Sequence, residues 1–162
     1  MDDLLPHPGY VIFMAVRNVY RLRRLTLSIQ ERVELFGRVF TLPGVEDPYF
    51  AFSEAGTSCF QLSDTLTPAK RDFALACALG EHELGVLKLS EDVRKGPLKP
   101  IIKARVELYA NVLLFSLRLS ATRLTLKLPP TLVTAGLVVA TVCEVCGRVE
   151  LGTLLDLCRE MM

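Results

Sequence analysis

Several short segments in which apolar and polar residues alternate limit the fold of this chain more than any other feature. Alternation with a period of two is typical of a strand that buries one face. It occurs at 25–35 and again at 104–112, so we expect a first strand region at about 19–42 and a later strand at 104–112. Strands that are grouped, without a regular alternation of strand and helix, predict an α+β fold rather than a doubly wound parallel sheet.

Two hairpins are expected in addition to these strands. Aromatic-rich segments at 49–52 and 59–62 flank a loop that contains Gly56, a residue that accepts the positive φ of a tight turn. Leucine-rich segments at 117–119 and 124–128 flank a short polar loop and predict the second hairpin. The centre of the chain is therefore expected to be β-sheet.

One helix is well marked between these two hairpins. Thr67 suits the N-cap position and Pro68 the first helical position. Phe73, Cys77 and Gly80 follow at helical spacing on a face that is otherwise lined by small alanines. Glycine commonly ends a helix, so we expect this one to stop at Gly80.

The C-terminal segment supports three further expectations. The β-branched residues of 137–142 favour a strand, with a helix as the alternative. Thr153 and Asp156 can form a carboxylate version of the capping box and predict a last helix. The longest apolar run, 132–143, is shorter than the roughly twenty residues of a membrane span, so we expect no transmembrane segment.

These elements predict one compact α+β domain over 1–162, a mainly antiparallel sheet with two or three packed helices and a flexible tail at 1–10. A chain of 162 residues can bury a full core without disulfides or a structural metal. Its first residues carry no basic flank and do not resemble a secretory signal. We therefore expect an intracellular, cytoplasmic protein, peripheral at the inner face of a membrane, that is not secreted.

The segment CEVCGR contains the most conspicuous pair of cysteines, Cys143 and Cys146. Their spacing is that of one knuckle of a zinc ribbon, but a structural zinc ion needs four ligands. No second closely spaced pair of cysteines or histidines occurs in the sequence. We therefore expect packed thiols and no cofactor, with Cys143 and Cys146 as the candidate metal ligands if any metal binds. A redox pair is disfavoured because the residues after Cys146 look extended rather than helical.

Catalytic signatures are missing from the sequence. There is no phosphate-binding loop, no dinucleotide-binding glycine motif and no esterase motif around a serine. His7 and His82 are the only histidines, and His82 is expected to lie in solvent just past a helix end. We therefore expect a protein that is not an enzyme.

The charges of the chain are separated into blocks, although the net charge is only +1. Residues 17–38 carry six basic and two acidic side chains, and residues 93–128 carry eight basic and one acidic. Between them, residues 39–92 carry three basic and nine acidic side chains. Basic blocks of this kind predict contact with a phosphate-bearing partner. The alternative is that these cations only solvate a half-buried sheet and pair with the acidic blocks.

The strand assignments place these cations on the sheet. Arg21 and Arg23 are expected on one face of the first strand, and Lys103 and Arg105 on one face of the second. The connection 90–100 is expected to be an exposed loop, because its glycine and prolines oppose a helix. The residues predicted to bind an anionic partner are Arg21, Arg23, Arg24, Arg94, Lys95, Lys99, Lys103 and Arg105.

These observations lead to a functional hypothesis. We expect a non-catalytic structural or assembly protein that self-associates and contacts an anionic membrane surface or an RNA backbone through its basic sheet regions. A viral matrix protein works in this way, an analogy of architecture and charge only. The basic block at 93–128 holds few aromatic residues, which disfavours base reading, and we expect no sequence-specific DNA binding. The alternative is an adaptor for another protein, with a C-terminal region stabilised by buried thiols or zinc.

Overall fold

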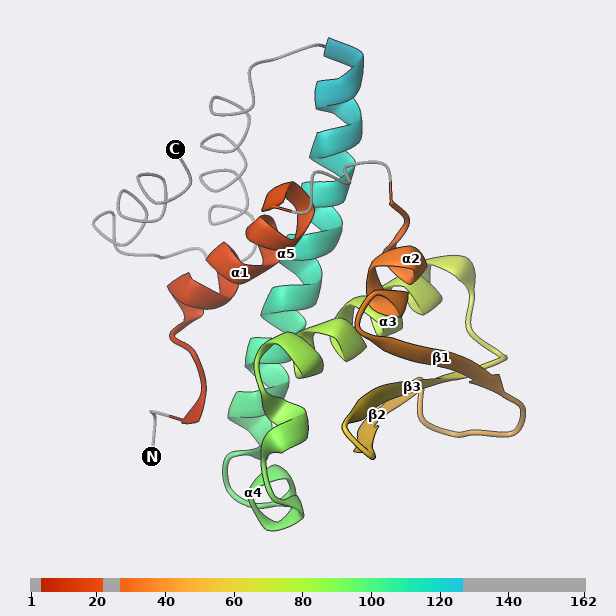
Figure 1. The fold of residues 1–162 in the computed structure, drawn as a ribbon, viewed down its shortest axis with the longest axis vertical. Helices are drawn as coiled ribbons and strands as arrows, with labels where there is room; N and C mark the ends of the chain where they lie inside the picture. The colour runs from red at the N-terminus through yellow and green to blue at the C-terminus, as the bar shows by residue number, and fades with distance from the viewer. Residues whose placement is uncertain (1–3, 22–26, 127–162) are drawn as a thin grey trace.

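The computed structural model describes residues 4–21 and 27–126 of the chain (Figure 1). It contains the helices α1 (Pro8–Arg21), α2 (Ile29–Glu34), α3 (Pro68–Glu83), α4 (Glu91–Lys95) and α5 (Lys99–Leu126), the short 3₁₀ helix η2 (Val86–Lys88), and the strands β1 (Gly37–Leu42), β2 (Tyr49–Glu54) and β3 (Thr57–Ser63). The α+β class is confirmed. Five α-helices in the described ranges exceed the two or three predicted.

The three strands form one mixed sheet in the order β1-β3-β2. The hairpin predicted around Gly56 is confirmed: β2 and β3 are antiparallel and joined by Ala55 and Gly56, whose φ angles are 50° and 79°. Strand β1 pairs with β3 in parallel, with Gly37 opposite Ser58 and Leu42 opposite Ser63. The expected mainly antiparallel sheet is therefore a mixed one.

The strand region expected at 19–42 is only partly a strand. Helix α1 extends to Arg21 and α2 begins after Ser28, and among the described residues of this region only β1 is a strand. Ser28 and Glu31 form a capping box: the Ser28 hydroxyl accepts from the Glu31 amide at 3.2 Å, and the Glu31 carboxylate accepts from the Ser28 amide at 2.7 Å. This reciprocal cap is favourable enough to start a helix inside an alternating segment.

The strand expected at 104–112 and the second hairpin are also wrong, because α5 runs without interruption from Lys99 to Leu126. Helix α5 packs against α1 and against α3, on two different sides. A helix covered on two sides carries apolar residues over much of its circumference, so every second position in this segment can be apolar. The segment 117–126 also lacks the Gly, Pro and Asn residues that favour a tight turn.

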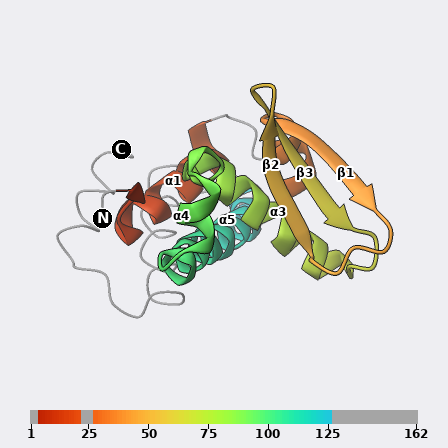
Figure 2. The same ribbon diagram turned by 90° about the horizontal axis from the view of Figure 1, so that it is seen from below.

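Helix α3 lies between α5 and the sheet, as Figure 2 shows from below. Thr67 caps the helix by accepting from the Lys70 amide at 3.4 Å, and Pro68 is its first residue, both as predicted. The helix continues through Gly80 to Glu83, however, and Gly85, whose φ is 76°, follows its C-cap Leu84. A Cβ atom on Gly80 would lie 3.0 Å from the Tyr109 ring of α5, so this glycine permits close packing of two helices.

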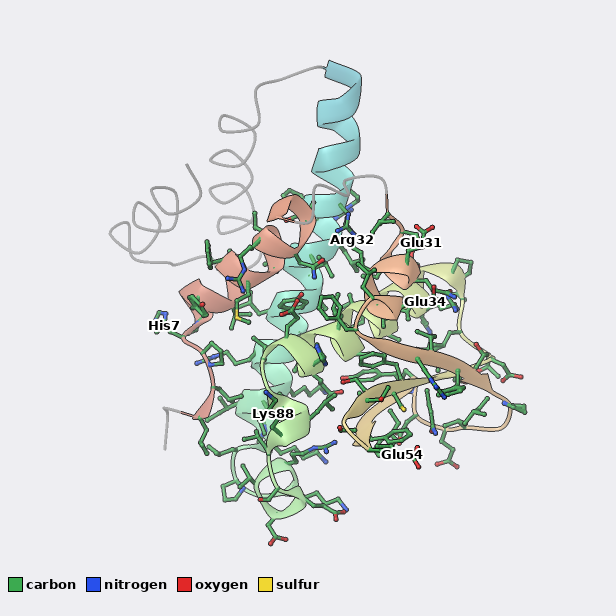
Figure 3. All side chains as sticks on the ribbon, in the orientation of Figure 1. His7, Glu31, Arg32, Glu34, Glu54 and Lys88 are labelled. Carbon is green, nitrogen blue, oxygen red and sulfur yellow. The ribbon has the colours of Figure 1, made fainter. Side chains whose placement is uncertain are left out.

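The inner face of the sheet packs on α3 and contributes the buried residues Ala51, Phe60 and Leu62 to the core. Helix α2 adds a fully buried arginine, Arg32, which donates from Nη1 to the Asn18 carbonyl of α1 at 3.2 Å. Figure 3 labels this side chain beside α2. Desolvation lowers the pKa of Arg32. In the part of the chain described, no helix is long and apolar enough to span a bilayer.

Replacing Gly37 with alanine should destabilise the fold severely. A Cβ atom at this position would lie 2.1 Å from the Ser58 carbonyl oxygen, a backbone atom that cannot move without separating β1 from β3. We expect Gly37→Ala to lower the free energy of unfolding by about 3 kcal/mol or more in urea denaturation. Thr41→Ala, an exposed position of the same strand, is the matched control and should cost less than about 1 kcal/mol. Equal effects of the two variants would contradict this account of the parallel pair.

Candidate functional site

An open groove of about 1160 Å³ lies along α3, with β2 on one side and α4 and the start of α5 on the other. Figure 1 shows these elements around the lower end of α5. The groove combines an apolar floor with a charged rim. It is lined by Asp47, Pro48, Tyr49, Phe50, Leu66, Ala69, Lys70, Phe73, Ala74, Cys77, Glu81, Val86, Glu91, Arg94, Lys95, Lys99, Ile102, Lys103, Val106 and Glu107.

Helix α3 supplies one continuous stripe of this lining. Lys70, Phe73, Cys77 and Glu81 succeed one another at intervals of three and four residues, so they project from one side of the helix. The face of Phe73 and Cys77 was predicted from their spacing. Ile102 from α5 extends the apolar floor across the groove and is 7% exposed.

The cations of the groove come mainly from the segment that was expected to be a loop and a strand. Arg94 and Lys95 lie instead on α4, and Lys99 and Lys103 on the first turns of α5. These four predicted residues converge on the groove, and Lys70 joins them from α3. The predicted binding cations are therefore brought together by helices and not by the sheet.

Ion pairs engage some of these cations. Lys95 forms an exposed ion pair with Glu91 on α4, and Lys103 lies 3.9 Å from the Glu107 carboxylate one turn further along α5. Within the described ranges, Lys70 and Lys99 form no ion pair. These two ammonium groups of the rim therefore have no carboxylate partner in the described ranges.

Arg105 does not line the groove. A helix turns by about 100° per residue, so Lys103 and Arg105 lie on different sides of α5 rather than on one face of a strand. The Arg105 Nε donates to the Pro6 carbonyl at 3.2 Å. This side chain therefore joins α5 to the segment that precedes α1.

The other predicted sites are elsewhere or undescribed. Arg21 is the last residue of α1, so it does not share a strand face with Arg23. Arg23 and Arg24, the pair Cys143 and Cys146, and the elements predicted after residue 126 lie outside the described residues. Two other cysteines, Cys59 and Cys77, are buried free thiols.

Glu81 is the buried carboxyl of the groove, and the sequence analysis did not single it out. Burial raises its pKa to about 7, and Arg94 opposes that shift only in part. One sequence pattern could have identified Glu81: it follows Cys77 by four residues and so lies on the apolar stripe of α3. Burial also raises the pKa of Cys77 to about 12 and raises the pKa of Tyr49. The thiol and the phenol are therefore neutral near pH 7, which makes them poor nucleophiles or bases.

A serine and a histidine meet away from the groove. Ser58 Oγ of β3 and His82 Nδ1 of α3 are 2.8 Å apart, and His82 packs against the rings of Phe36 and Phe60. His82 is half-buried inside α3, so its expected position in solvent past a helix end is wrong. Burial lowers the pKa of His82. Because Ser58 is only 8% exposed, this pair joins the sheet to α3 and does not present a nucleophile.

Comparisons of the chain with protein-family models, with curated proteins and with solved structures find no match.

Replacing Glu81 with glutamine should change how stability depends on pH. The folded state raises the pKa of this carboxyl from 4.5 to about 7, so the parent is most stabilised by it below pH 4.5 and loses that contribution as pH rises through about 7. Glutamine cannot ionise. We expect Glu81→Gln to match the parent at about pH 4 and to exceed it by about 2 kcal/mol at about pH 8, in urea unfolding at each pH. A stability difference that stays constant with pH would contradict this prediction.

Proposed function

We propose that this protein is a non-catalytic structural and assembly protein that contacts an anionic partner through the cationic side of its groove. The observation that carries this proposal is the convergence of Arg94, Lys95, Lys99 and Lys103 with Lys70 around one cavity. Cations gathered in this way raise the local concentration of an anionic partner. The contact comes from helices α4 and α5 rather than from the basic sheet regions first expected.

A membrane surface is favoured over RNA as the anionic partner. Asp47, Glu91 and Glu107 stand among the cations of the groove. They would repel a phosphate backbone that has to follow the groove over several residues, but less so a lipid head group that meets one cluster of cations. In this proposal the protein works in the cytoplasm, peripheral at the inner face of a membrane.

Self-association is the second part of the proposal, and the outer face of the sheet supports it. Phe40 and Phe50 are 41% and 50% exposed, although both are large and apolar. Phe50 also stacks on Phe52, with 5.6 Å between ring centroids. An exposed aromatic face of this kind favours contact with another protein surface. A second copy of the chain is the proposed partner, and an adaptor that binds a different protein is the alternative.

Neutralising three groove cations should weaken binding of the anionic partner. Each lysine near an anionic surface contributes about 1 kcal/mol, so the combined Lys95→Gln, Lys99→Gln and Lys103→Gln variant should bind anionic vesicles about a hundredfold more weakly at low salt. Co-sedimentation with anionic and neutral vesicles measures this, with RNA binding in parallel. Thermal unfolding should hardly change, since these lysines are exposed.

A matched control removes three cations that do not line the groove. Arg38, Arg71 and Lys88 lie on β1, on α3 and on η2, and Figure 3 labels Lys88. Their combined replacement by glutamine changes the net charge equally and should weaken vesicle binding far less. Equal losses in the two triple variants would contradict a role of the groove, and unchanged vesicle and RNA binding in the groove variant would contradict the proposal as a whole.

The aromatic face should control the molar mass in solution. Light scattering over a range of protein concentrations should detect oligomers of the parent. The combined Phe40→Ser and Phe52→Ser variant should be a monomer, because it removes two aromatic side chains from this face. Neither side chain lines the groove, so the variant tests the face alone. Leu35→Ser is the control, since this leucine is 45% exposed but lies after α2 and outside the sheet. A parent that is a monomer at every concentration and salt level would contradict self-association.

A further inference from the structure

We propose that the groove binds one molecule of a long-chain anionic lipid, with its hydrocarbon chain on the apolar floor and its head group against the rim cations. This inference rests on the proposed contact with an anionic partner and names the ligand. It differs from attraction to a charged surface, because the hydrocarbon chain has to leave the bilayer and enter the protein.

The charge of the groove fits a single head group. Five cations and four carboxyl groups line it, so its net charge is about +1 with every group ionised and about +2 when Glu81 is protonated. That excess balances the one or two negative charges of a phosphate head group. It is too small to hold a polyanion along the whole groove, which disfavours RNA as the occupant.

The position of the head group follows from the cations that are not already paired. Lys70, Arg94 and Lys99 form no ion pair in the described ranges, whereas Glu91 holds Lys95. Burial raises the pKa of Glu81 and Arg94 opposes that shift, so Arg94 already acts on this carboxyl, which leaves Lys70 and Lys99 for the head group. Lys70 stands at the start of α3 and Lys99 at the start of α5. A head group between these two ammonium groups would leave the remaining length of the groove to the hydrocarbon chain.

The floor provides the surface that a hydrocarbon chain requires. Phe73, Val86, Ile102 and Val106 line it, and the last three are 1%, 7% and 3% exposed. The volume of about 1160 Å³ lies just above the roughly 300–1,000 Å³ of most small-molecule sites. Phe50 stands half exposed at the edge of the groove, where a bound chain would cover it.

The sequence contains no tryptophan, so a single tryptophan can report on the groove. Phe50→Trp places this fluorophore at the groove edge. Phe40→Trp is the matched control, because it lies in the same cross-strand row of the sheet on β1 and does not line the groove. The probes are hexadecyl phosphate, hexadecanol and butyl phosphate, each below the concentration at which it forms micelles.

We expect hexadecyl phosphate to shift the emission of Phe50→Trp to the blue and to saturate at one molecule per chain, as counted by native mass spectrometry of the parent. Phe40→Trp should not respond. Hexadecanol lacks the charge and butyl phosphate lacks the chain, so each should bind at least tenfold more weakly. Equal responses of the two reporters, or butyl phosphate binding as tightly as hexadecyl phosphate, would overturn the inference.

Two variants of the apolar lining separate this inference from the proposed function. Phe73→Gln makes the floor polar, and Ala69→Phe fills the groove from an exposed position that tolerates a larger side chain. Each should weaken hexadecyl phosphate binding about tenfold and leave co-sedimentation with anionic vesicles within twofold. Vesicle binding by a parent that takes up no hexadecyl phosphate would overturn the lipid site and leave the proposed function standing. The lipid site would also be overturned if RNA displaced the vesicles and bound equally well to the parent and to the two lining variants.

Discussion

The close contact of α3 with α5 is the constraint on which the rest of this structure depends. Gly80 lets the Tyr109 ring approach the α3 backbone, and Tyr109 is fully buried there. Because α3 also carries the sheet on its other side, the distance between these two helices sets the distance between α5 and β2. The groove lies in that interval, along α3 from Ala69 to Glu81. A side chain at position 80 would therefore widen the interval or displace Tyr109, and would alter the groove without touching any residue in it.

The cations reach the groove because of how the chain enters α5. Ser90 caps the short helix α4 by accepting from the Val93 amide at 3.4 Å, and Pro100 lies in the first turn of α5, where its missing amide hydrogen costs nothing. Lys95, Lys99 and Lys103 are spaced by four residues across this junction. Gly96 and Pro97, which argued against a helix, therefore separate two helices, and cations of both helices line the groove.

Local patterns allowed the α+β class, the β2–β3 hairpin and the start of α3 to be predicted, because a turn glycine and an N-cap act through neighbouring residues. The end of α3 could not be predicted, since the role of Gly80 depends on Tyr109, which is distant in sequence. The course of α5 was missed because a helix buried on two sides resembles an alternating strand. For the site, four of the predicted cations line one groove, but helices carry them there instead of a loop and a strand, and their binding of an anionic partner stays a prediction. Glu81 was missed because its burial comes from packing against other elements, which no local pattern reveals.

Two neighbouring residues near the end of α3 give the fold opposing responses to pH. Burial raises the pKa of Glu81 and lowers the pKa of His82. Glu81 therefore stabilises the fold at low pH, and this contribution is lost as pH rises through about 7. His82 contributes fully above its usual value of 6.5, and its contribution is lost as pH falls through the lowered pKa of the folded state. Burial favours the neutral form of both residues: Glu81 lines the groove but is largely desolvated, and His82 packs against the rings of Phe36 and Phe60. Two desolvated residues of α3 thus resist ionisation, and the positive charge of the groove comes mainly from the cations of α4 and α5.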